Sequence, residues 1–124
     1  MFNPKSVETQ TQNWDFRFAS QKDIVINKVT LAENQDLQEG SVLGKVTATG
    51  EYVLSVAAAT DGSQVPSVVL VDNAKTASGE TPDVPVYESA HLHTTFLKFG
   101  AGHDATTVRE ALREKGIFIS PPGN

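Results

Sequence analysis

The side chains best suited to chemistry in this sequence are its three histidines. His91 and His93 stand two residues apart, so a strand would place both rings on one face, where they could chelate a metal ion. A third ligand could come from His103 or Asp104. Strong zinc sites, however, have closely spaced Cys and His pairs or recognisable third and fourth ligands. We therefore expect no metal site, and we expect the pair to lie on a solvated or subunit-facing strand surface.

Three further stretches resemble parts of enzyme motifs. His103-Asp104 could act as a base and its orienting acid, but no serine in a nucleophile elbow accompanies it. Residues 61–63 (Asp-Gly-Ser) resemble the loops of nucleotide hydrolases, although turn chemistry alone explains them. Residues 100–102 (Gly-Ala-Gly) lack the preceding strand, the spacing and the later acid of a dinucleotide site. The sequence does not exclude a mechanism based on two catalytic carboxylates, but no pair of acidic residues stands out. We expect no catalytic residue and no cofactor.

Composition restricts the classes of partner. The chain has 124 residues, enough for one domain with its own core, and a formal net charge of −5. Its 10 Lys and Arg are scattered, which argues against nucleic acid, because phosphate binding needs clustered cations. Cysteine is absent, so thiolate chemistry and disulfides are excluded. No apolar run resembles a signal peptide or approaches the ~20 residues that cross a bilayer. We expect a soluble protein made in the cytoplasm, with no membrane partner.

Residues 1–22 differ from the rest of the chain. They are polar, have no sustained period, and carry three Lys and Arg against two Asp and Glu. They also contain the only tryptophan, Trp14, with Phe16 and Phe18 on the same side of any extended strand. A disordered tail is the simple interpretation. The aromatic stripe favours instead an arm that orders on a partner, and its extended length of ~70 Å would reach a neighbouring subunit.

The remaining residues read as short strands separated by turns. Strands are predicted over residues 23–31, 41–47, 52–56, 67–71, 84–87 and 117–119, with loops at 32–40 and 72–83. Gly44 indicates a bulge or a close approach within its strand. Pro85 marks residues 84–87 as an edge strand, because proline cannot donate a ladder hydrogen bond. Residues 91–99 alternate only in part. This pattern predicts a mainly β fold, a small barrel or a bent ribbon.

One short helix is predicted late in the chain. Asp104 can cap its first turn, Thr107 and Glu110 offer a second, overlapping capping box, and Gly116 suits the C′ position. Apolar residues recur on one face, and we expect Val108, Ala111 and Leu112 to face the β structure. The helix carries no catalytic signal. With no enzyme site in view, physical association is the better explanation of the sequence.

The order of several short motifs resembles one known family. They are Val-Leu-Gly-Lys-Val-Thr at 42–47, Gly-Glu-Tyr-Val at 50–53, Ala-Thr-Asp-Gly-Ser-Gln-Val-Pro at 59–66, Val-Leu-Val-Asp at 69–72, Leu-Lys-Phe-Gly-Ala-Gly-His at 97–103, and the helix leading into Gly-Ile-Phe at 116–118. Together they resemble the head decoration proteins of tailed phages, the family of the lambda capsid-stabilising protein. The resemblance covers residues 24–119. Each motif is bland alone, and the order and spacing carry the specificity.

The resemblance implies a fold, a partner and a place. The fold would be β-clip-like, a small incomplete barrel with one short C-terminal helix and a flexible N-terminal arm. The protein would be a homotrimer that binds the major capsid protein outside the expanded phage head, and it would hold the shell against packaged DNA. Residues 1–22 would be the capsid-contacting arm, through Trp14, Phe16, Arg17 and Phe18, and residues 23–124 the decoration domain. Such arms pair with a capsid strand.

Two alternatives remain open at this point. The first is a small β-clip-type enzyme, such as a nucleotide hydrolase, because one fold can serve unrelated functions. Such an enzyme should show polar residues clustered at strand ends and a glycine-rich phosphate loop, neither of which stands out. The second is a phage surface-adhesion module, which predicts glycan or host-surface binding.

Overall fold

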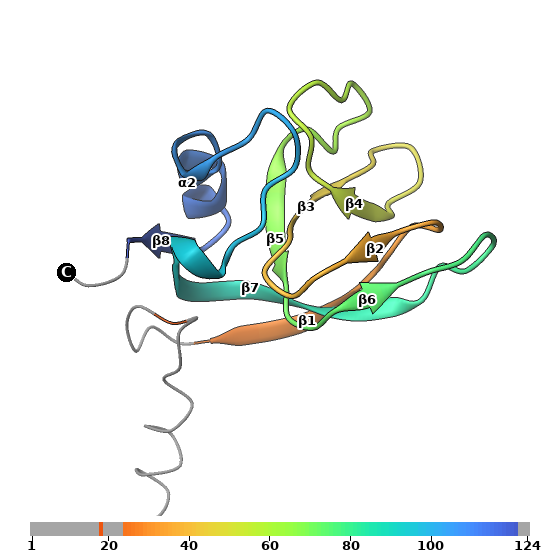
Figure 1. The fold of residues 1–124 in the computed structure, drawn as a ribbon, viewed down its shortest axis with the longest axis horizontal. Helices are drawn as coiled ribbons and strands as arrows, with labels where there is room; N and C mark the ends of the chain where they lie inside the picture. The colour runs from red at the N-terminus through yellow and green to blue at the C-terminus, as the bar shows by residue number, and fades with distance from the viewer. Residues whose placement is uncertain (1–17, 19–23, 122–124) are drawn as a thin grey trace, which may run out of the picture.

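The long strand β7 (Asp83–His93) forms the axis of the fold in the computed structural model, which describes Phe18 and residues 24–121 (Figure 1). The other strands are β1 (Val25–Thr30), β2 (Asp36–Leu37), β3 (Val42–Lys45), β4 (Tyr52–Leu54), β5 (Pro66–Leu70), β6 (Ala74–Lys75) and β8 (Ile117–Ser120). The main sheet has the order β1-β7-β5-β3-β4, and β8 pairs in parallel with the second half of β7. Strands β2 and β6 form a separate two-stranded sheet within the loops predicted at 32–40 and 72–83.

The prediction of an edge strand at residues 84–87 is wrong. Strand β7 is central: β1 pairs with one side of it, and β5 pairs with the other. Pro85 is tolerated because its carbonyl accepts from the Val71 amide at 3.1 Å, just past the end of β5. In an antiparallel ladder the N–H and C=O of one residue point to the same side, so an N–H at Pro85 would also point toward the β5 side. The β5 ladder has already ended there, so the hydrogen bond that proline cannot donate is not needed.

A bulge explains why β7 is longer than its sequence pattern suggests. Val25 pairs with Ser89 while Ile26 pairs with Tyr87, so Glu88 is an extra residue in the ladder. Val86 and Tyr87 are both buried although they are neighbours, because the strand changes which face it buries at this point. The period-2 signal is thereby broken, and the strand runs on to His93 before the 3-10 turn Thr94–Phe96.

The helix α2 (Ala105–Glu114) forms where the sequence predicts it. The Asp104 carboxylate accepts from the amides of Thr106 and Thr107, both at 2.9 Å, while the Thr107 hydroxyl accepts from the Asp104 amide at 2.8 Å. The capping box is therefore Asp104 with Thr107, and the predicted second box starting at Thr107 does not form. Gly116 has φ +99°, which confirms the left-handed position after the helix.

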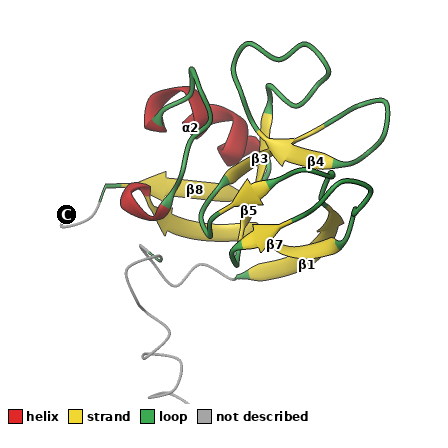
Figure 2. Ribbon diagram, turned by 45° about the vertical axis from the view of Figure 1, so that its right-hand side comes forward, coloured by secondary structure: helices red, strands yellow, loops and turns green. Residues whose placement is uncertain are grey.

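The core divides into two clusters on either side of the bulge. One lies between α2, β8 and the second half of β7, and the other between β1, β3, β5 and the first half of β7. Val108 and Leu112 are fully buried and Ala111 half-buried, as expected for the face of α2 that meets the sheet. Figure 2 shows α2 lying over β8 and the end of β7. The sheets are not closed into a barrel, so the predicted mainly β, incompletely closed architecture with one short C-terminal helix is confirmed.

Gly44 combines both features predicted for it. The register of β3 against β5 shifts between Leu43 and Gly44, which is a bulge. A Cβ on Gly44 would stand 2.0 Å from the carbonyl oxygen of Ser63. The chain at Ser63 therefore crosses directly over the strand, and the Ser55 hydroxyl donates to the same oxygen at 2.7 Å. Only a residue without a side chain lets these backbones approach so closely.

Candidate interaction surfaces

The histidines do not assemble a site. The Nε2 of His91 shares a hydrogen bond of 2.9 Å with the Ser120 hydroxyl, and the Nδ1 of His93 is buried without a hydrogen-bond partner among the described residues. His103 lies at the start of α2, where its ring bonds to the Thr107 hydroxyl and the Gln64 carbonyl, both at 3.0 Å. Within residues 24–121, no three His, Asp or Glu side chains come close enough to hold a metal ion.

Two of the three enzyme-like stretches, His103-Asp104 and residues 61–63, serve as local structure. The His103 ring bonds to groups other than the Asp104 carboxylate, which is occupied as the helix cap. The Asp61 carboxylate accepts from the Ser63 hydroxyl at 2.5 Å and from the Ser63 amide at 3.0 Å. These two bonds lower the pKa of Asp61 and close the turn around Gly62. Turn chemistry therefore accounts for the Asp-Gly-Ser stretch.

Phe18 is the one residue of the predicted arm that the structure describes. It forms an antiparallel bridge with Leu92 and contacts the Tyr87 ring edge-to-face, with 5.7 Å between ring centroids. Its half-buried side chain packs against the core cluster beneath α2. The other predicted contact residues, Trp14, Phe16 and Arg17, lie outside the described residues. Phe18 thus marks where the N-terminal segment meets the body.

Exposed apolar side chains stand next to that point. Ile24, Val25 and Ile26 are 43%, 44% and 48% exposed, although a half-buried strand would alternate. Strand β1 pairs with β7 and with no other described strand along Val25–Thr30, and the chain bridges to Tyr52 of β4 only at Leu31, just past its end. Among the described residues, the outer edge of β1 is therefore open up to that point. Three consecutive exposed β-branched residues on an open edge form a surface suited to a protein partner.

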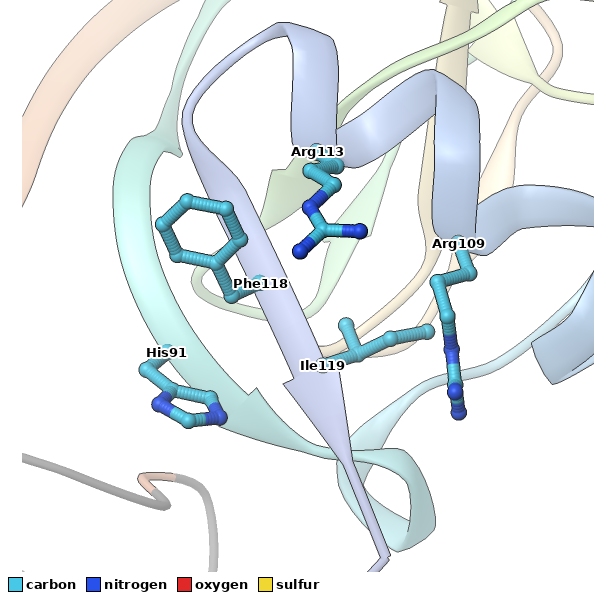
Figure 3. Close-up of a pocket in the computed structure, with 5 residues that line it drawn as sticks. All are labelled: His91, Arg109, Arg113, Phe118 and Ile119. Carbon is cyan, nitrogen blue, oxygen red and sulfur yellow. The ribbon is translucent and has the colours of Figure 1, made fainter.

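A second open edge lies on β8, beside a hollow of about 310 Å³. Figure 3 shows how the five lining residues are arranged around the strand. Arg109 and Arg113 reach from successive turns of α2, while His91 and Phe118 lie on the other side of β8 from Arg109 and Ile119 (Figure 3). The rings of His91 and Phe118 meet edge-to-face at 6.4 Å. The hollow therefore wraps around the edge of the strand and combines two guanidinium groups with apolar side chains.

Another hollow, of about 360 Å³, lies over β4 and the first half of β5. It combines opposite charges, because Lys45, Glu88 and Lys115 all line it. Burial, and secondarily the nearby Glu88 carboxylate, raise the pKa of the half-buried Tyr52 that lines the same hollow. Its mixed charges offer no clear preference for a ligand of either sign.

The open edge of β8 was not predicted from the sequence. The sequence does contain the residues that line this surface. Two arginines four residues apart share a face of α2, and a Phe stands between two isoleucines in the next strand. The missing information was that β8 pairs with β7 and with no other described strand, which depends on tertiary structure and cannot be read from local pattern.

Comparison with known proteins gives one clear result. The model of the family described as "Bacteriophage lambda head decoration protein D" matches residues 7–117. No curated protein matches the sequence. Among the described residues, no helix has the length and apolar character needed to cross a membrane.

Proposed function

The chain belongs to the bacteriophage lambda head decoration protein D family, and from this premise we propose that it binds as a homotrimer to the outer surface of the expanded phage head. Its general role follows from the family, whose members are structural proteins of the phage head. In the proposed role the trimer clamps neighbouring major capsid proteins and stabilises the shell against the pressure of packaged DNA. The protein would be made in the bacterial cytoplasm and would then join the virion.

The observation that carries the proposal is the extent of the family match. It begins at residue 7 and ends at residue 117, so it includes most of the proposed arm as well as nearly all of the β body. We divide the chain into an arm at residues 1–22 and a decoration domain at residues 23–124. A match of this extent supports a shared role for both parts.

The arm is proposed to contact the capsid through Trp14, Phe16, Arg17 and Phe18. The contacts of Phe18 with Tyr87 and Leu92 fix where the arm leaves the body. The exposed residues of β1 begin a few positions later, so the arm and the open edge of β1 would form one continuous surface. An extended capsid segment could add to this surface through main-chain hydrogen bonds.

A trimer makes weak single contacts sufficient. Three arms presented to one three-fold position turn the second and third contacts into intramolecular events, which raises avidity by a factor of about 10² or more. If the binding site on the capsid forms only after expansion, the decoration protein binds the expanded shell alone. Binding then stabilises the expanded shell by mass action.

Three measurements test the proposal. Light scattering after size-exclusion chromatography should report a trimer at micromolar concentration, and a strict monomer would count against it. Removal of residues 1–22 should leave the circular dichroism of the body unchanged but weaken binding to expanded heads. DNA-filled heads that lack the protein should release their DNA at a lower temperature than decorated heads, and equal release temperatures would refute the stabilising role.

A further inference from the structure

At its outer edge, the backbone of β8 has N–H and C=O groups that pair with no described strand. The Ala90 amide donates to the Gly116 carbonyl at 3.4 Å, which sets the phase of the parallel ladder. In that phase the backbone groups of Phe118 face β7, while the N–H and C=O of Ile119 face away from it. Of the strands that the structure describes, only β7 pairs with β8. The outer edge of β8 is therefore an open template for one more strand.

The charges beside this edge are of one sign. Arg109 and Arg113 line the hollow, and none of the described acidic residues lines it. Arg113 has a loose contact of 3.8 Å with Glu110, but both side chains are largely exposed, and a surface pair of this kind is easily exchanged. No described carboxylate is in salt-bridge contact with Arg109. Residues 24–121 contain twelve Asp and Glu against seven Lys and Arg, so this positive hollow stands out on an acidic body.

The shape of the hollow suits an extended segment with alternating side chains. Along a strand, successive side chains point to opposite faces. On one face of β8 an added strand would meet the two guanidinium groups, and on the other it would meet the rings of Phe118 and His91. Guanidinium groups bind carboxylates in paired hydrogen bonds, and the 37% exposed Phe118 ring offers apolar contact.

A second copy of this chain fits the hollow poorly. The open edge of its main sheet at β1 carries Lys28 and no carboxylate, and β4 at the other end of the sheet order carries no charged residue. Strand β2 carries Asp36, but it spans only two residues, so none of these strands would bring alternating acids to the two arginines. A different chain is the better occupant.

We propose that the open edge of β8, with Arg109 and Arg113, docks an extended acidic segment of the capsid protein that alternates carboxylate and apolar side chains. This inference rests on the proposed function and adds a contact separate from the arm. Each trimer would then hold the shell at two places per subunit, the arm and the β8 edge.

The test measures binding of the full chain to expanded, undecorated heads by co-sedimentation. The double variant Arg109→Glu/Arg113→Glu should weaken binding at least about tenfold, because both carboxylate contacts become repulsive. Arg109→Gln/Arg113→Gln removes the charges without placing acids near the end of α2, and it should also weaken binding. The control Lys45→Glu/Lys75→Glu makes the same net charge change at exposed positions away from β8 and should bind like the unmodified chain. Circular dichroism and light scattering establish that each variant keeps its fold and oligomeric state.

The outcomes separate this inference from the function on which it rests. If the unmodified chain does not bind heads, the proposed function fails and the docking site with it. If the unmodified chain binds and the Gln variant binds equally well, the β8 site is refuted while the decoration role stands.

A photo-crosslinking residue in place of Phe118 identifies the occupant. A crosslink to the capsid protein supports the proposal. A crosslink to another copy of this chain overturns it and assigns the edge to the subunit interface.

Discussion

Leu112 is a position where a single substitution should lower the stability of the fold without altering a residue of either proposed binding surface. Its side chain is fully buried beneath α2, in the cluster that includes Val108, Phe96 and Ile117. Truncation of a buried leucine to alanine removes its contacts and leaves a cavity, which costs about 2–5 kcal/mol. Domains of this size have a total stability of about 5–15 kcal/mol, so Leu112→Ala should still fold. For a chain of this length the loss corresponds to a fall in Tm of roughly 8–19 °C.

Leu112→Asp should have a stronger effect. It adds an uncompensated carboxylate to the same apolar site, and an unpaired buried charge costs about 3–5 kcal/mol beyond the lost packing. The sum approaches the whole stability of the domain, and we expect the body to unfold before any binding surface is altered locally.

Thermal and urea unfolding followed by far-UV circular dichroism provide the assay. The matched control is Glu114→Ala, which lies in the same turn of α2 but on its exposed face and should change stability by less than about 0.5 kcal/mol. Equal Tm values for Leu112→Ala and Glu114→Ala would refute the packing of α2 against the sheet.

Four further substitutions test other parts of the fold. Gly44→Ala should lower the free energy of unfolding by about 1–3 kcal/mol, because its Cβ would strike the Ser63 carbonyl. Gly79 has φ +82° with open space around it, so Gly79→Ala should lower that free energy by only about 1 kcal/mol. A lower urea midpoint for Gly79→Ala than for Gly44→Ala would contradict this. Phe18→Ala should lower stability by about 1–2 kcal/mol through loss of the edge-to-face contact with Tyr87, and an unchanged Tm would show that Phe18 does not anchor the arm. The lowered pKa of Asp61 gives a stabilising contribution that is complete above its ordinary value of 3.8 and is lost as the pH falls through the lowered value. The urea midpoint of the unmodified chain should therefore fall more steeply in acid than that of Asp61→Asn, and parallel profiles would contradict the Asp61–Ser63 hydrogen bonds.

Local chemistry allowed some elements to be predicted well. The helix was located because its signals are all within a few residues: Asp104 at the start, Gly116 at the end, and an apolar face between them. The bulge at Gly44 was likewise signalled by a glycine inside a β-branched run. Such signals are reliable because the residue type restricts the backbone conformation at its own position.

Pairing could not be predicted in the same way. Pro85 suggested an edge strand, yet β7 is central, because the β5 ladder happens to end where the proline N–H is missing. The bulge at Glu88 hid the continuation of the strand by changing its buried face. The β8 edge depends on a parallel pairing between segments more than twenty residues apart. Each of these features is set by tertiary context rather than by local propensity.

The most direct test of the decoration role is a binding isotherm of the unmodified chain on phage heads before and after expansion. The protein is mixed at increasing concentration with undecorated heads, and the pelleted amount is measured. We expect saturable binding to expanded heads, with a plateau of three copies at each three-fold position, and little binding to unexpanded heads. A chain that stays in the supernatant with expanded heads at every concentration would contradict the proposed function.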